Sequence, residues 1–243
     1  MKGIVAIVVV VAACRLVGAV PGEVPPPRDQ PRVVTPGAAS SDPPSDATVL
    51  FHGGSGDLAS WRASDGGVAP WLADGSDLVV APGTGDLYTR AAFGSCQLHV
   101  EFATPAVVHG DGQDRGNSGV YLMGLYEIQV LDSYRNETYA HGGAGAVYKQ
   151  HAPLVNASRP PGQWQSYDII FHAPAFDADG KLVARATVTL LHDGVLVQDH
   201  VELMGVTSHD QAPYYQAHAA RLPLRLQDHG APVRYRNLWI RDL

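Results

Sequence analysis

Basic side chains and cysteines are both scarce in this sequence of 243 residues. The 17 Lys and Arg residues are outnumbered by 24 Asp and Glu residues, which gives a formal net charge of −7 with His neutral. This balance argues against a basic nucleic-acid-binding surface. The two cysteines are Cys14 and Cys96, and Cys14 falls in the N-terminal leader, so the rest of the chain has no partner for Cys96 in a disulfide. We expect Cys96 to be a small buried apolar side chain.

Long apolar runs are rare and helical periodicity is missing. Only one long apolar stretch occurs, so the chain is not a multispanning membrane protein. No long amphipathic helix, internal repeat or glycine-rich phosphate loop is visible, which argues against a helical bundle and against nucleotide binding. The 26 glycines and 18 prolines instead favour a β architecture with many turns.

The first residues have the pattern of a secretory signal. Lys2 is followed by an apolar stretch, 3–14, which is too short to span a bilayer comfortably. Small residues up to Ala19 suit an ordinary signal peptidase, whereas Val-Ala-Ala-Cys, ending at Cys14, resembles a bacterial lipobox whose cysteine becomes acylated. We therefore expect a signal peptide over residues 1–19, with membrane attachment through Cys14 as an open alternative. The protein would be secreted, periplasmic or attached to the cell envelope.

Residues 20–47 are rich in Pro and Ser and have few large apolar side chains, so they predict a linker before a domain at 48–243. In that domain the apolar residues alternate with a period of two. Leu98, Val100 and Phe102, for example, share one face of a strand. Asp193-Gly194 is typical of a two-residue hairpin turn. Further strands are predicted at 78–81, 119–122, 125–131, 164–172, 185–192, 195–201, 222–227 and 233–240. This pattern predicts an all-β fold, an antiparallel jelly-roll β-sandwich.

The strand at 126–130 carries polar residues that a simple core strand would lack. Alternation sends Tyr126, Ile128 and Val130 into the core and leaves Glu127 and Gln129 on the other face, roughly 7 Å apart. The polar stretch 114–119 leads into the preceding strand, and the short link at 123–124 predicts a tight hairpin between the two strands. We therefore expect the Asn at position 117 to lie near these two side chains.

Three blocks of sequence resemble a known family. They are 115–122 continued by 126–133, then 145–148 leading to 161–164, and then 226–230 continued by 236–238. In this order they resemble the 3-keto-disaccharide hydrolase domain family over about residues 50–243. The resemblance implies a concanavalin A-like, glucanase-like jelly roll that acts on a carbohydrate substrate, namely glycosides oxidised at C3. That family often carries Arg where this chain has Met123 or Leu125, and Arg115 is the residue that would compensate.

Cleavage of a glycoside with a ketone at C3 needs only a few catalytic groups. The ketone acidifies the C2 proton, a base removes it, the anomeric substituent leaves, and water adds to the resulting enone. The reaction requires a base, hydrogen-bond donors for the enolate oxygen and an acid that protonates the leaving oxygen. Glu127 and His229 are the titratable candidates in the matched blocks and are predicted as catalytic. The predicted substrate-binding residues are Asn117, Gln129, Tyr148, Gln227 and Arg115.

Two other interpretations remain open and one is disfavoured. A retaining β-glucanase needs two carboxyl groups roughly 5 Å apart, but Gln129 stands where the second would be expected, and Asp132 lies at an odd offset from Glu127. A non-catalytic carbohydrate-binding module on the same face is the open alternative to an enzyme. A divalent metal held by Glu127, Asp228 and His229 is also open, because spacing alone cannot demonstrate it.

Overall fold

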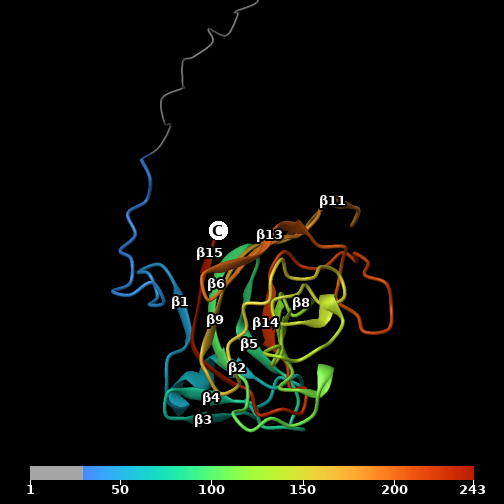
Figure 1. Cartoon of the computed structure of the whole chain (residues 1–243). Coiled ribbons are helices and arrows are strands. Elements are labelled where there is room, and N and C mark those ends of the chain that lie inside the picture. The colour runs from blue at the N-terminus through green and yellow to red at the C-terminus, as the bar shows by residue number, and fades with distance from the viewer. Residues whose placement is uncertain (1–29) are drawn as a thin grey trace, which may run out of the picture. The chain divides into compact units, whose positions relative to one another are not determined.

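Antiparallel strands dominate residues 30–243, which are the residues that the computed structural model describes (Figure 1). Helical structure within this range is limited to short 3₁₀ turns at Ser55–Ser60, Gly112–Asp114 and Ala140–Gly142. The all-β antiparallel fold predicted from the period of two is therefore confirmed. The predicted signal peptide at 1–19, with Cys14, lies outside the described residues, as does the linker up to residue 29. Between residues 30 and 243, no helix is both long and apolar enough to cross a membrane.

The larger sheet has eight strands, all paired antiparallel. In spatial order they are β13 (Val195–Glu202), β12 (Thr187–His192), β9 (Gln165–His172), β6 (Cys96–Ala103), β15 (Arg234–Asp242), β4 (Asp77–Val79) and β3 (Leu72–Asp74), with β1 (Thr48–Phe51) also pairing with β15. The predicted hairpin turn joins β12 to β13: Asp193 and Gly194 have φ of 49° and 76°, and His192 pairs with Val195.

The smaller sheet has five strands and carries the polar residues singled out in the sequence. In spatial order they are β2 (Trp61–Arg62), β5 (Leu87–Phe93), β14 (Leu222–Leu226), β7 (Ser118–Leu122) and β8 (Tyr126–Val130). A separate pair, β10 (Ala175–Phe176) and β11 (Leu182–Ala184), forms a two-stranded sheet. The tight link between β7 and β8 is also found, and Met123 and Gly124 both have positive φ there, 54° and 69°.

The hydrophobic core lies between the two sheets. Ile128 and Val130 of β8 belong to the same buried cluster as Leu98 and Val100 of β6, and all four are completely buried. A polar contact also crosses the gap, where Tyr167 Oη of β9 donates to the carbonyl oxygen of residue 129 at 2.8 Å. These contacts fix β8 against the larger sheet, so its polar side chains are held on the opposite face of the smaller sheet.

Cys96 lies at the start of β6, in the same core, and is 2% exposed. It is a free thiol, and its burial raises its pKa to about 12, with the charge of Asp242 adding to the effect. The expectation of a small buried apolar side chain is confirmed, since a thiol with so high a pKa is not reactive.

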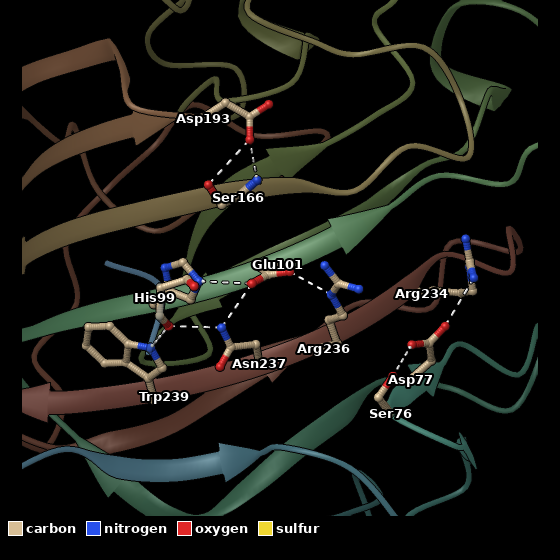
Figure 2. A network of polar contacts seen from close by, with 11 residues as sticks. Ser76, Asp77, His99, Glu101, Ser166, Asp193, Arg234, Arg236, Asn237 and Trp239 are labelled. Carbon is tan, nitrogen blue, oxygen red and sulfur yellow. Dashed lines mark hydrogen bonds and ion pairs between the residues drawn. The ribbon is translucent and has the colours of Figure 1, made fainter. Parts of the chain in front are cut away.

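The outer face of the larger sheet carries a polar network (Figure 2). His99 on β6 places Nδ1 2.7 Å from Asp168 Oδ1, and its ring stacks on Trp239 with centroids 5.4 Å apart. Glu101, two residues along the strand, accepts hydrogen bonds from Arg236 Nε at 2.6 Å and Asn237 Nδ2 at 2.9 Å. Burial raises the pKa of Glu101, but these hydrogen bonds outweigh it and leave the pKa below its usual value. The network therefore ties β6 to β15 and β9.

Part of the predicted linker packs against this network. The carbonyl oxygen of Ser41 accepts hydrogen bonds from Asn237 Nδ2 at 2.9 Å and from Trp239 Nε1 at 2.8 Å. Asp46 forms an ion pair with Arg241 at 2.8 Å. Residues 34–243 accordingly form one compact unit. The chain thus contacts the sandwich before the predicted domain boundary at residue 48.

Candidate active site

Two polar side chains of β8 lie on the outer face of the smaller sheet, as the alternation predicts, but they are not solvated. Glu127 is 3% exposed and Gln129 is 1% exposed. Loops cover them and also complete the hydrogen bonds of the strand edge: Tyr148 N donates to the carbonyl oxygen of Glu127 at 3.2 Å, and the Glu127 N–H donates to Thr207 Oγ1 at 3.0 Å. The expected open face is therefore the floor of a site that loops partly cover.

A cavity of about 210 Å³ lies over this face. It is lined by Asn117, Tyr121, Glu127, Gln129, Tyr148, Thr207, His209, Arg225, Gln227 and His229. The structure thus brings together six of the seven residues selected from the sequence, from β7, β8, β14 and the segments around them. The roles assigned to these six residues stay predictions.

Glu127 is the only carboxylate in the lining of this cavity, and its environment favours the neutral form. Burial raises its pKa to about 7, although a hydrogen bond from Tyr121 and the positive charge of Arg225 partly oppose this effect. Arg225 lies 3.4 Å from the centre of the Tyr121 ring and forms an ion pair with Asp86 at 3.1 Å. A carboxyl group with a pKa near neutrality can both take and return a proton.

The amide of Gln129 supports the same carboxylate. With its nitrogen turned toward Glu127, it donates to Oε1 at 3.0 Å and to the carbonyl oxygen of Ser118 at 3.2 Å. Asn117, beside it, donates from Nδ2 to the carbonyl oxygen of Gln113 at 2.7 Å. The neutral amide of Gln129 thus holds the carboxylate without adding charge.

Gly119 provides the space in which the carboxylate lies. A Cβ atom at this position would be 2.7 Å from Glu127 Oε1 and 2.8 Å from Tyr121 Cε2. Both distances are shorter than van der Waals contact allows, so any larger residue would displace one of these side chains. The conformation of the Glu127 side chain therefore depends on the absence of a side chain at Gly119 on the neighbouring strand.

The three remaining candidates lie at the sides of the cavity. Tyr148 Oη lies 2.6 Å from Tyr139 Oη. Gln227 Nε2 donates to Tyr121 Oη at 3.2 Å, while its Oε1 is buried without a hydrogen-bond partner. His229 is exposed at the rim and also lines a neighbouring cavity.

Arg115 is the predicted residue that the structure does not bring to this cavity. Its Nε donates to Asp132 Oδ2 at 2.7 Å, and its Nη2 donates to the carbonyl oxygen of Tyr134 at 3.1 Å. The guanidinium thus joins the loop before β7 to the loop after β8, outside this cavity, and its predicted contact with a substrate stays a prediction. The same ion pair occupies Asp132, so that carboxylate does not join Glu127 in a catalytic pair.

Four lining residues were not selected from the sequence: Tyr121, Thr207, His209 and Arg225. Two had a usable signal. Arg225 precedes Gln227 by two residues and so shares its face of the strand, and Tyr121 is the outward residue of its strand. Thr207 and His209 lie in a loop about 80 residues after Glu127, and no local pattern places that loop over the strand.

In the described part of the chain, no arrangement of side chains supports the metal interpretation. Asp228 uses its carboxylate to accept hydrogen bonds from Gly85 N at 3.0 Å and Gly230 N at 2.9 Å, so it stabilises turns. No group of three or more His, Cys, Asp and Glu side chains between residues 30 and 243 is placed to hold a metal ion. Glu127, Asp228 and His229 do not form such a group.

The sequence profile of the 3-keto-alpha-glucoside-1,2-lyase-like domain matches residues 46–241. The chain belongs to this family. The match covers both sheets and every strand that lines the cavity, which confirms the resemblance derived from the three blocks. A comparison with the curated proteins finds no match.

Solved structures support the assignment of a 3-keto-alpha-glucoside-1,2-lyase-like domain. A proposed glycosyl hydrolase from Parabacteroides distasonis is 42% identical, with a TM-score of 0.84 over 88% of this chain and 93% of its own. A second proposed glycosyl hydrolase from the same organism is 19% identical, with a TM-score of 0.60 over 82% of this chain and 94% of its own. The second match shows a shared fold only.

Proposed function

We propose that this lyase-like domain cleaves 3-keto-glycosides by removing the C2 proton and expelling the anomeric substituent, followed by addition of water. The observation that carries the proposal is Glu127, a single buried carboxylate with a pKa of about 7 at the floor of a 210 Å³ cavity. A base of this pKa is suited to proton abstraction next to a ketone at neutral pH. The family match and the 42% identical proposed glycosyl hydrolase support a glycoside as substrate.

The cavity contains a side chain for each step of this reaction. The Glu127 carboxylate takes the proton from C2, and the electron pair moves toward the C3 oxygen to form the enolate. The guanidinium of Arg225 and the neutral amides around it stabilise that negative charge. The enolate then collapses, the bond from C1 to the glycosidic oxygen breaks, and His229 at the rim protonates the departing oxygen. Water adds to C1 of the enone while C2 regains a proton.

The same geometry argues against the two rival functions. A retaining glucanase needs a second carboxyl group within roughly 5 Å of the first, and the cavity lining contains only Glu127. A binding module gains nothing from burying an ionisable carboxylate, because desolvation costs free energy that a neutral amide would avoid. An enzyme gains from this desolvation, because it raises the pKa of a carboxylate that must accept a proton.

We also propose that the domain is exported. The support is the N-terminal pattern at 1–19 and the lipobox sequence that ends at Cys14. A glycosidase outside the cytoplasm would meet glycosides before they are taken up.

The experiment that tests the reaction uses a 3-keto-glucoside with a chromogenic leaving group, in D₂O. We expect release of the chromophore and deuterium at C2 of the sugar product, above the level that free 3-keto-glucose acquires in buffer. The matching glucoside with an unoxidised C3 should be inert because its C2 proton is not acidic. Release from the unoxidised glucoside at an equal rate would disprove the elimination route.

A further inference from the structure

A second cavity, of about 470 Å³, opens beside the candidate active site. Its walls come from the loops that follow β6, precede β7, follow β8 and join β14 to β15. His229 lines both this cavity and the 210 Å³ cavity that holds Glu127, so the two are neighbours with one side chain at their junction. We call this second cavity the loop-end cavity.

Two charged groups of the loop-end cavity, Arg115 and Asp132, already have partners, whereas Asp114 and His109 are exposed in its wall. Arg115 and Asp132 are paired at 2.7 Å, and both also bond to the backbone of Tyr134, at 3.1 Å and 3.2 Å. They have little capacity left for the hydroxyl groups of a ligand. A second sugar ring carries several hydroxyl groups, and besides Asp114 and His109 the wall offers them few free side-chain partners, so each hydroxyl left unpaired costs free energy.

Apolar side chains form much of the remaining wall. Val107 and Val108 are 68% and 44% exposed, which is unusual for valine, and they lie together in the loop that follows β6. The other apolar residues of the wall are Pro105, Ala231 and Pro232. Exposed apolar surface at the rim of a site gains free energy when a ligand covers it.

We propose that the loop-end cavity binds the leaving group of the substrate and that it selects an apolar leaving group, an alkyl or aryl alcohol, over a second sugar. This inference rests on the proposed cleavage of 3-keto-glycosides. With C2 over Glu127, the substituent on C1 is two bonds away and must leave the small cavity toward a side where its oxygen can be protonated. His229 lies on that side.

Another cavity, of about 510 Å³, is the alternative location for the leaving group. It is lined by residues 133–144 and 152–156 in part, including the exposed Leu154. It shares no lining residue with the cavity that holds Glu127. Tyr139 in its wall lies 2.6 Å from Tyr148 of the Glu127 cavity. Of the two, however, only the loop-end cavity shares a lining residue, His229, with the Glu127 cavity, so the loop-end cavity is the better location.

The test is a series of 3-keto-glucosides of n-alkyl alcohols, from methyl to hexyl. These alcohols are nearly equal in acidity, so a change in kcat/KM along the series reports binding of the chain and not leaving-group chemistry. We expect kcat/KM to rise about two- to fourfold per methylene until the cavity is filled. A 3-keto-disaccharide should be a poorer substrate than the hexyl compound.

Two variants place the effect in the loop-end cavity. Val108→Asp should lower the hexyl-to-methyl ratio of kcat/KM by about tenfold, because it puts a charge where the chain lies. Val183→Asp, at a valine that is 67% exposed on β11 and lines neither cavity, should leave the ratio unchanged. Equal kcat/KM along the series, a better disaccharide, or an equal effect of both variants would overturn this inference and leave the proposed reaction intact. No turnover of any compound would overturn both.

Discussion

Tyr121 and Glu127 are directly opposed in the register of β7 and β8, and the tyrosine hydroxyl donates a hydrogen bond to the carboxylate. Their side chains leave the sheet on the face that lines the cavity. Burial and the neighbouring carboxylate raise the pKa of Tyr121, so its hydroxyl stays protonated and keeps its proton for the bond to Glu127. The pair therefore sets how easily Glu127 ionises.

Replacing this donor should shift the pH dependence of the reaction. In wild type we expect kcat/KM to rise as Glu127 ionises through pH about 7. Tyr121→Phe removes a hydrogen bond that favours the ionised form, so the rise should move up by about one pH unit. The measurement is kcat/KM against pH with a 3-keto-glucoside. Tyr134→Phe, at a tyrosine outside the cavity, should not move the profile, and an unmoved profile in Tyr121→Phe would contradict this account.

Glu127→Gln should remove turnover. It keeps the shape of the side chain but not the base, so kcat should fall by about 10²–10⁴-fold while KM changes less. His229→Asn is the parallel test at the rim, and there the loss should depend on the leaving group, being larger for a poor leaving group that needs a proton. Wild-type turnover in both variants would remove these two residues from the mechanism.

The same Glu127→Gln substitution should stabilise the fold at high pH. The pKa of Glu127 is raised on folding to about 7, so the folded state holds a proton that the unfolded chain has lost between pH about 4.5 and 7, and stability falls as pH rises through that window. The variant lacks this loss, which amounts to about 3 kcal/mol at most. We expect a higher Tm than wild type at pH 8 and little difference at pH 4.5. The exposed Glu202→Gln should show no such difference, and neither should Glu127→Gln if the carboxylate is ionised at its ordinary pKa.

Gly119→Ala should damage the site without touching a polar group. The added methyl would be 2.7 Å from Glu127 Oε1, so the carboxylate has to move. We expect kcat to fall by about 10²-fold while circular dichroism stays that of a β protein. Gly56→Ala is the control, because the added atom meets nothing there and the backbone φ is not positive. Retained activity in Gly119→Ala would mean that the position of the carboxylate is not critical.

Export can be tested at the lipobox. In a bacterial host, a fatty-acid analogue should label the wild-type protein and not Cys14→Ser. Labelling of the variant, or release of unlabelled wild type into the medium, would leave only the ordinary secretory route.

The fold and much of the site could be predicted because both depend on local alternation. Glu127 and Gln129 were placed on one face of one strand, and the tight link at 123–124 brought Asn117 near them. What alternation could not predict was burial, because the cover over Glu127 comes from loops distant in sequence, such as the one that carries Thr207. The location of Arg115 outside the Glu127 cavity could not be predicted for the same reason: its partner, Asp132, is 17 residues away across a hairpin. Arg225 could have been selected from the sequence, because it lies two residues before Gln227 and therefore on the same face of the strand.

The buried thiol of Cys96 has a practical consequence. It is 2% exposed in the core, and no covalent cross-link holds residues 34–243 together. The domain should therefore keep the same melting behaviour with and without a reducing agent. Modification of Cys96 by a thiol reagent would require the sandwich to open. The rate of that modification would therefore report the rate of spontaneous unfolding.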